Sequence, residues 1–220
     1  MYIRDQHAVA VRVFRWLVFL LAAGYVIRHL IFTADYSLPG GPFRHLTFWG
    51  LMFSFAAASR MLALTEGRTH RDWSTLVGVT AVINLLVVFL YWRLWFTDPA
   101  LVNSGGPNLW YDEYYLHLLG PALQWFDALF VFGAFRRVLP ALGGLAPAVL
   151  GYVAWIELFV GRFNDFPRGS VTAGLPYPFL NDMEIVARAG FYGTTSVTAL
   201  AFLGGFWGLA TLARRLFGSS

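Results

Sequence analysis

Long apolar runs constrain the fold of this chain more than any other feature of its sequence. A helix needs about 20 mainly apolar residues to cross about 30 Å of hydrocarbon, and in lipid it must satisfy its own backbone hydrogen bonds. Six runs meet this requirement, at about 12–32, 45–64, 74–96, 114–135, 145–162 and 187–212. We therefore predict an all-α polytopic membrane protein, a six-transmembrane-helix bundle that forms a single domain over residues 1–220.

Composition supports this prediction and excludes several classes of function. The chain is 58% hydrophobic and 13% charged, whereas about a quarter of the residues in a soluble domain are charged. It contains no cysteine, which excludes disulfides, thiol catalysis and Cys-ligated metal ions. All 16 basic residues are arginine, which excludes chemistry through a lysine imine. The net charge of +4 falls in the loops, so we expect the lipid bilayer as a partner and no nucleic acid.

The arginines are distributed unequally between the two ends of the predicted helices. An even number of crossings places both termini on one side, where ten arginines fall: Arg4, Arg12, Arg15, Arg60, Arg68, Arg71, Arg136, Arg137, Arg214 and Arg215. Six fall on the opposite side: Arg28, Arg44, Arg93, Arg162, Arg168 and Arg188. Because arginine-rich loops remain in the cytoplasm, we expect both termini there. The lysine-free composition favours a bacterial inner membrane as the location.

Two polar residues are candidates for catalysis. Thr47 and His117 lie near the starts of the runs 45–64 and 114–135, on the side opposite the termini, and they can meet if these helices are neighbours. A threonine hydroxyl attacks an ester only when a base accepts its proton, and histidine titrates near neutrality. The alternative is structural, because a threonine at a helix start often caps the helix and a membrane-edge histidine often faces the headgroups.

Asp127 and Glu157 are also candidates, because ionisable groups inside apolar runs are costly and often functional. Asp127 follows His117 by ten residues, about 15 Å along a helix, which is too far for direct contact. The carboxylates either form salt bridges or line a polar cavity with Asn84, as in a transporter. The arginines considered as salt-bridge partners are Arg93, Arg162 and Arg188.

Two further patterns carry less information. His29, His45 and His117 share one predicted depth, and such a group could bind zinc or haem. The sequence shows no pairing of histidines across facing helices, so we expect neither a metal nor a cofactor. The pair Gly204 and Gly208, with its spacing of four, permits close helix packing.

Several segments resemble one known family. Residues 40–48, which read Gly-Gly-Pro-Phe-Arg-His-Leu-Thr-Phe, are similar to the approach to the second helix in the androgen-induced and androgen-dependent TFPI-regulating proteins. Further similar segments keep the same order along the chain: 71–73, His117 with Asp127 ten residues later, 177–180 and 191–195. Together they cover about three-quarters of the chain.

The resemblance implies a six-helix membrane hydrolase that cleaves fatty acid esters of hydroxy fatty acids. The threonine nucleophile and the histidine of the family match Thr47 and His117. Two departures leave the substrate open. Pro121 lies one residue closer to His117 than in the relatives, and Val160 and Gly161 replace a histidine pair, with Glu157 replacing an uncharged residue nearby.

The mechanism that we expect starts with an amphiphilic ester entering from the outer leaflet. His117 deprotonates Thr47, an acyl-threonine forms, and water then releases the acid. Asp127 is expected to organise a polar floor beneath the pair, and Asp182 could orient His117. The candidate donors to the oxyanion are Arg44, Asn181, Arg188 and the amides at the start of the second helix. The alternative is a non-enzymatic lipid- or haem-binding protein, or a small transporter that uses Asp127 and Glu157.

Overall fold

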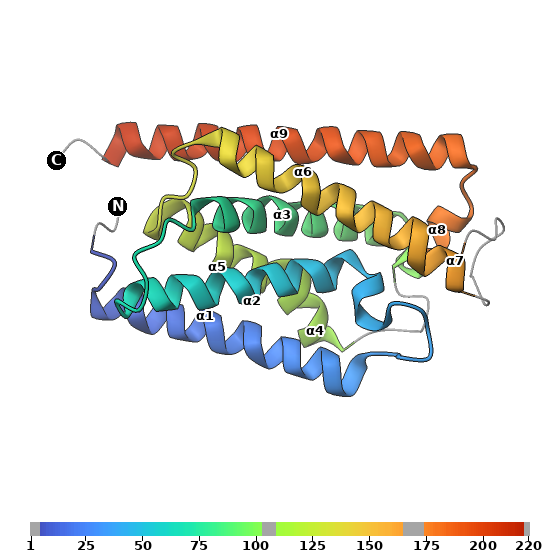
Figure 1. Cartoon of the computed structure of the whole chain (residues 1–220), viewed down its shortest axis with the longest axis horizontal. Coiled ribbons are helices and arrows are strands. Elements are labelled where there is room, and N and C mark those ends of the chain that lie inside the picture. The colour runs from blue at the N-terminus through green and yellow to red at the C-terminus, as the bar shows by residue number, and fades with distance from the viewer. Residues whose placement is uncertain (1–4, 103–108, 165–173, 218–220) are drawn as a thin grey trace.

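A computed structural model describes residues 5–102, 109–164 and 174–217. It confirms the all-α fold class, with no strand among these residues. Two arginines of the charge analysis, Arg4 and Arg168, lie outside them. The helices run side by side along the long axis, and α1 begins at the same end of the bundle at which α9 finishes (Figure 1). We call this the termini end and the opposite end the cavity end.

Five helices within the described residues are long and apolar enough to cross a membrane. The first is α1, Val9–Arg28, continued by the π-helical turn His29–Thr33; the second and third are α2, Leu46–Thr65, and α3, Ser74–Thr97. The fourth is α6, Val138–Trp155, continued by the π-helical turn Ile156–Val160 and by α7, Gly161–Phe163. The fifth is α9, Ile185–Phe217. Shorter pieces are the 3-10 turns Gly41–Arg44 and Pro99–Leu101 and the helix α8, Pro178–Asn181.

The sixth predicted run, 114–135, is present in a different form. It is a succession of α4, Trp110–Tyr114, a π-helical turn Tyr115–Leu119, α5, Gly120–Phe126, and a second π-helical turn Asp127–Val131. This succession packs against α1, α2 and α3 inside the bundle. It contains three carboxylates, those of Asp112, Glu113 and Asp127, and it is not among the five helices that are long and apolar enough to cross a membrane. Its end at Val131 is followed by Gly133, whose φ of 73° turns the chain.

The start of α6 corrects the predicted boundary at residue 145. The helix begins seven residues earlier, at Val138, and runs through Gly143 and Gly144. A Cβ on Gly144 would lie 2.9 Å from the Cγ2 atom of Val79. Glycine is therefore used here for close approach of α6 to α3 rather than for a turn.

The core lies between α2, α3, α6 and α9, and α3 is the most buried of the long helices. The outer faces of α1, α6 and α9 expose many leucine and valine side chains, as expected for surfaces in contact with lipid. Gly204 and Gly208 are on such an exposed face of α9, and no atom lies within 4 Å of a Cβ built on either. This pair therefore makes no helix packing within the described chain.

Candidate active site

A cavity of about 760 Å³ opens at the cavity end and extends into the bundle. Its outer part is lined by polar side chains, Asp35, Arg44 and Asp112 among them, and its inner part by apolar ones such as Phe53 and Ala148. Phe53 follows Thr47 by six residues on α2, so the apolar part reaches about 9 Å deeper than Thr47. The cavity therefore accommodates a molecule with a polar end and an apolar chain.

Thr47 and His117 meet where the polar and apolar parts of this cavity join. The Thr47 Oγ1 atom lies 3.3 Å from the His117 Nε2 atom, and both residues line the cavity. The threonine is in the first turn of α2, and the histidine is in the π-helical turn that follows α4. The hydroxyl is therefore within reach of a base that could accept its proton.

Two glycines shape the turn that leads to Thr47. Gly40 and Gly41 have φ angles of 82° and 48°, which glycine adopts without the strain that other residues incur. A Cβ on Gly40 would also lie 3.0 Å from the Cγ2 atom of Val160. The Gly-Gly pair is thus needed both for the conformation of this turn and for its contact with the π-helical turn Ile156–Val160 that continues α6.

Aromatic side chains hold the carbonyl groups of the same turn. The indole N–H groups of Trp49 and Trp155 both donate to the Phe43 carbonyl, at 2.8 and 3.1 Å. The Tyr152 hydroxyl donates to the Arg44 carbonyl at 3.0 Å. These bonds connect the start of α2 to α6 and fix the position of the nucleophile candidate.

The backbone of His117 is held by a comparable bond. In an α-helix its carbonyl would accept the N–H of the residue four positions later, but that residue is Pro121, which has none. The indole N–H of Trp92 donates to the His117 carbonyl instead, at 2.8 Å. Single π-helical turns within helices are frequent at functional sites, and here the turn carries the imidazole toward α2.

Two residues that the sequence interpretation missed contact the His117 ring. The Tyr91 ring stacks on the imidazole, with centroids 3.4 Å apart and an angle of 5° between the planes. The Glu113 Oε2 atom lies 3.3 Å from His117 Nδ1, and the Tyr91 hydroxyl donates to the same oxygen. The sequence did contain a signal, because Glu113 and His117 have the spacing of four that brings side chains together on a helix.

The other candidates for oxyanion stabilisation or histidine orientation lie elsewhere, with one exception. Arg44 lines the cavity and donates from Nε to His45 Nε2 at 3.2 Å. Asn181 is fully buried, and its amide exchanges hydrogen bonds with the backbone of Leu175. Arg188 pairs with Glu157, and Asp182 is exposed. Glu113, rather than Asp182, contacts the His117 ring.

His45 also lines the cavity, just before α2 begins. Burial, and secondly the Arg44 guanidinium, lower the pKa of His45 to about 3. Its imidazole is therefore neutral at physiological pH. Among the described residues, no group of three or more His, Asp or Glu side chains is arranged so that it could hold a metal ion.

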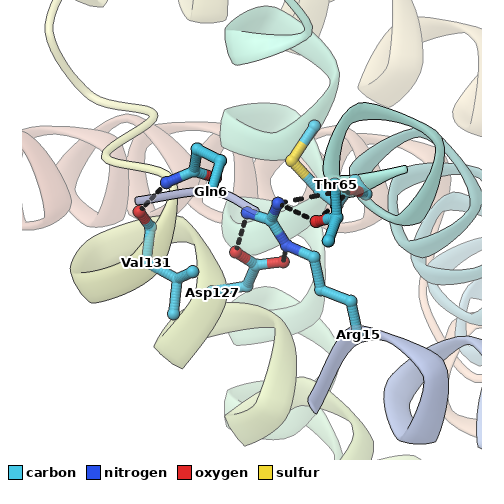
Figure 2. A network of polar contacts seen from close by, with 6 residues as sticks. Gln6, Arg15, Thr65, Asp127 and Val131 are labelled. Atoms are coloured by element: carbon cyan, nitrogen blue, oxygen red, sulfur yellow. Dashed lines mark hydrogen bonds and ion pairs between the residues drawn. The ribbon is translucent and has the colours of Figure 1, made fainter. Parts of the chain in front are cut away.

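Asp127 belongs to a different part of the bundle, toward the termini end. Its carboxylate accepts from Arg15 Nη2 at 2.8 Å and from Nε at 3.1 Å, and Arg15 Nη1 donates to Thr65 Oγ1 at 2.7 Å. Figure 2 shows this network, together with the bond from Gln6 to the Val131 carbonyl. The expected partners Arg93, Arg162 and Arg188 are wrong for Asp127, and Asp127 does not line the cavity. It forms no floor beneath the catalytic candidates.

Glu157 does form one of the predicted salt bridges, with Arg188. The Arg188 Nε atom lies 2.8 Å from Glu157 Oε1, which also accepts from the Tyr192 hydroxyl at 2.7 Å. Asn84 instead donates to Ser54 at 2.8 Å. These residues and Asp127 thus belong to three separate networks rather than to one polar path through the bundle.

Comparison with known proteins gives one match. The sequence model of the family described as FAR-17a/AIG1-like protein matches residues 10–210. No curated protein and no solved structure shows a significant match to the chain. The matched segment includes both Thr47 and His117.

Proposed function

The chain belongs to the FAR-17a/AIG1-like family, and we propose that it is an intramembrane hydrolase of amphiphilic lipid esters, such as fatty acid esters of hydroxy fatty acids. The observation that carries this proposal is the 3.3 Å contact between Thr47 Oγ1 and His117 Nε2 at the junction of the polar and apolar parts of the cavity. A substrate chain would occupy the apolar part, with its ester beside the pair.

The reaction proceeds in two steps. His117 Nε2 accepts the hydroxyl proton as Thr47 Oγ1 attacks the ester carbonyl, and the imidazolium then protonates the departing alkoxide, so that an acyl-threonine and an alcohol result. In the second step the same imidazole accepts a proton from water, the resulting hydroxide adds to the acyl carbonyl, and the proton returns to Thr47 Oγ1 as the acid leaves. Neither step needs a cofactor or a metal ion.

The negative oxygen that forms in each step requires hydrogen-bond donors, which often make the largest contribution to acyl-transfer catalysis. Arg44 is the one arginine among the described residues that line the cavity. Thr47 lies in the first turn of α2, where the helix dipole favours negative charge. We assign the stabilisation of the oxyanion to Arg44 and to this end of α2.

The direct test is ester turnover by the detergent-purified protein, with the released acid followed by mass spectrometry. Thr47→Ala and His117→Ala should abolish turnover, and Thr47→Ser should retain part of it because it keeps a hydroxyl. Thr97→Ala, which removes a hydroxyl that bonds within α3, is the control. Turnover that persists in Thr47→Ala, or its absence from the folded parent over a panel of lipid esters, would overturn the proposal.

We also propose that both termini are cytoplasmic in a bacterial inner membrane, which places the cavity at the outer leaflet. The unequal distribution of arginine supports this orientation. A reporter that is active only in the cytoplasm, fused after Ser220, should then be active, and an inactive but expressed fusion would contradict the orientation.

A further inference from the structure

Glu113 and Tyr91 touch His117, but the reaction described above gives them no part. The carboxylate lies on the Nδ1 side of the imidazole, away from the Nε2 atom that faces Thr47. Its Oε2 atom also accepts the Tyr91 hydroxyl, and the Tyr91 ring covers one face of the imidazole. The histidine is thus contacted at its edge by a carboxylate and on its face by an aromatic ring.

All three side chains are largely removed from water. His117 is 6% exposed and Tyr91 is 8% exposed, while the side chain of Glu113 is 12% exposed. A carboxylate with so little solvent is costly unless donors compensate its charge. Tyr91 supplies one such donor, and His117 Nδ1, 3.3 Å from the same oxygen, is the nearest position for a second.

The position of the imidazole proton decides whether His117 can act as a base. A neutral imidazole carries its proton on one nitrogen only. With the proton on Nδ1, facing Glu113, the Nε2 lone pair faces the Thr47 hydroxyl, as base catalysis requires. With the proton on Nε2 the ring could not accept the hydroxyl proton. A carboxylate beside Nδ1 selects the productive tautomer.

We propose that Glu113, held in place by Tyr91, is the positioning carboxylate of His117, so that Thr47, His117 and Glu113 act as a triad. The inference rests on the proposed function, since orientation matters to catalysis only if His117 is a base. The Nδ1–Oε2 distance of 3.3 Å is within ion-pair range, although the N–H is not aligned on the oxygen. Catalytic hydrogen bonds of this kind commonly tighten in the substrate complex. The helix itself sets the pairing, because Glu113 and His117 are four residues apart.

The test combines a measurement that needs no turnover with one that does. In protein labelled with ¹⁵N-histidine, the His117 signal, assigned by its loss in His117→Gln, reports the tautomer directly. The parent should hold the proton on Nδ1. Glu113→Gln should shift the ring toward the Nε2–H tautomer, because the amide can donate to Nδ1. Glu66→Gln, which makes the same substitution at the termini end, should leave the signal unchanged.

Turnover provides the second readout. Glu113→Gln should lower kcat by about 10²–10⁴-fold, the range of general-base catalysis, with little change in KM. Tyr91→Phe keeps the stacked ring and removes only the hydroxyl, so a loss of about tenfold is expected for one charged hydrogen bond. Because Tyr91→Phe changes one atom, it serves as the test variant if Glu113→Gln does not fold.

The outcomes separate this inference from the proposed function. A parent that holds its proton on Nε2 overturns the inference whatever the activity is. A Glu113→Gln variant that matches Glu66→Gln in tautomer and kcat also overturns it. A parent with the expected tautomer but no ester turnover would leave the position of the proton as inferred and would remove the hydrolase.

Discussion

The buried pair of Arg15 and Asp127 gives a prediction about stability that does not depend on the enzymatic function. Arg15 is 1% exposed and Asp127 is 4% exposed. The Arg15 guanidinium bonds both oxygens of the carboxylate and, in addition, the Thr65 hydroxyl and the Met61 carbonyl. It therefore connects α1 to α2 and to the π-helical turn Asp127–Val131 (Figure 2).

Asp127→Ala removes one partner and leaves the guanidinium buried without its counter-charge. Breaking a buried pair in this way costs about 3–5 kcal/mol. At about 2–4 °C per kcal/mol for a chain of this size, the midpoint of thermal unfolding should fall by about 6–20 °C. The double variant Arg15→Met with Asp127→Leu keeps apolar volume and buries no charge, so it should recover most of this loss.

Thermal unfolding of the detergent-purified variants, followed by tryptophan fluorescence and checked for monodispersity, measures these changes. Asp98→Ala, which removes an exposed carboxylate that caps a short 3-10 turn, is the control and should cost about 1 kcal/mol or less. A loss of stability below about 1 kcal/mol for Asp127→Ala would refute the reasoning. So would a double variant that loses at least as much stability as Arg15→Met alone and Asp127→Leu alone lose together. Ester turnover by a folded double variant should remain, because Asp127 does not line the cavity.

Two further predictions concern the cavity and its edge. Ala148→Phe should fill the inner, apolar part of the cavity and shift the preference toward shorter acyl chains, by about fourfold in kcat/KM for each methylene group that no longer fits. The control is Ala146→Phe, on an exposed face of the same helix. An unchanged dependence of kcat/KM on chain length in Ala148→Phe would contradict the assignment of this region. Burial lowers the pKa of His45 to about 3, so the unfolded chain binds a proton at this residue below pH 6.5 while the folded chain does not. Stability contributed by the neutral ring is therefore complete above pH 6.5 and lost as pH falls toward 3. His45→Gln should flatten the dependence of Tm on pH between about 6.5 and 4, and an unaltered dependence measured by thermal unfolding in detergent would contradict the burial of this imidazole.

Much of the fold could be predicted from the sequence, because in lipid the backbone must satisfy its own hydrogen bonds and long apolar runs therefore form helices. The starts of α2 and α3 lie within one residue of the predicted boundaries. A predicted boundary was wrong where a contact between helices determines the structure. At Gly144 the absence of a side chain allows α6 to approach Val79 on α3. The run that follows Trp110 was also different, because Asp112, Glu113 and Asp127 make it less apolar than the five long helices.

The sequence by itself determined that this chain forms apolar helices long enough to span a membrane. It also placed Thr47 and His117 near helix starts at the same predicted depth. Local spacing and the chemistry of the solvent suffice for such statements. Tertiary structure alone decided which faces meet: that Asp127 pairs with Arg15, 112 positions away, and that Tyr91 from α3 covers the His117 ring. These contacts depend on the rotation and offset of each helix against its neighbours. Those are fixed by packing of side chains distant in sequence, which no local pattern encodes.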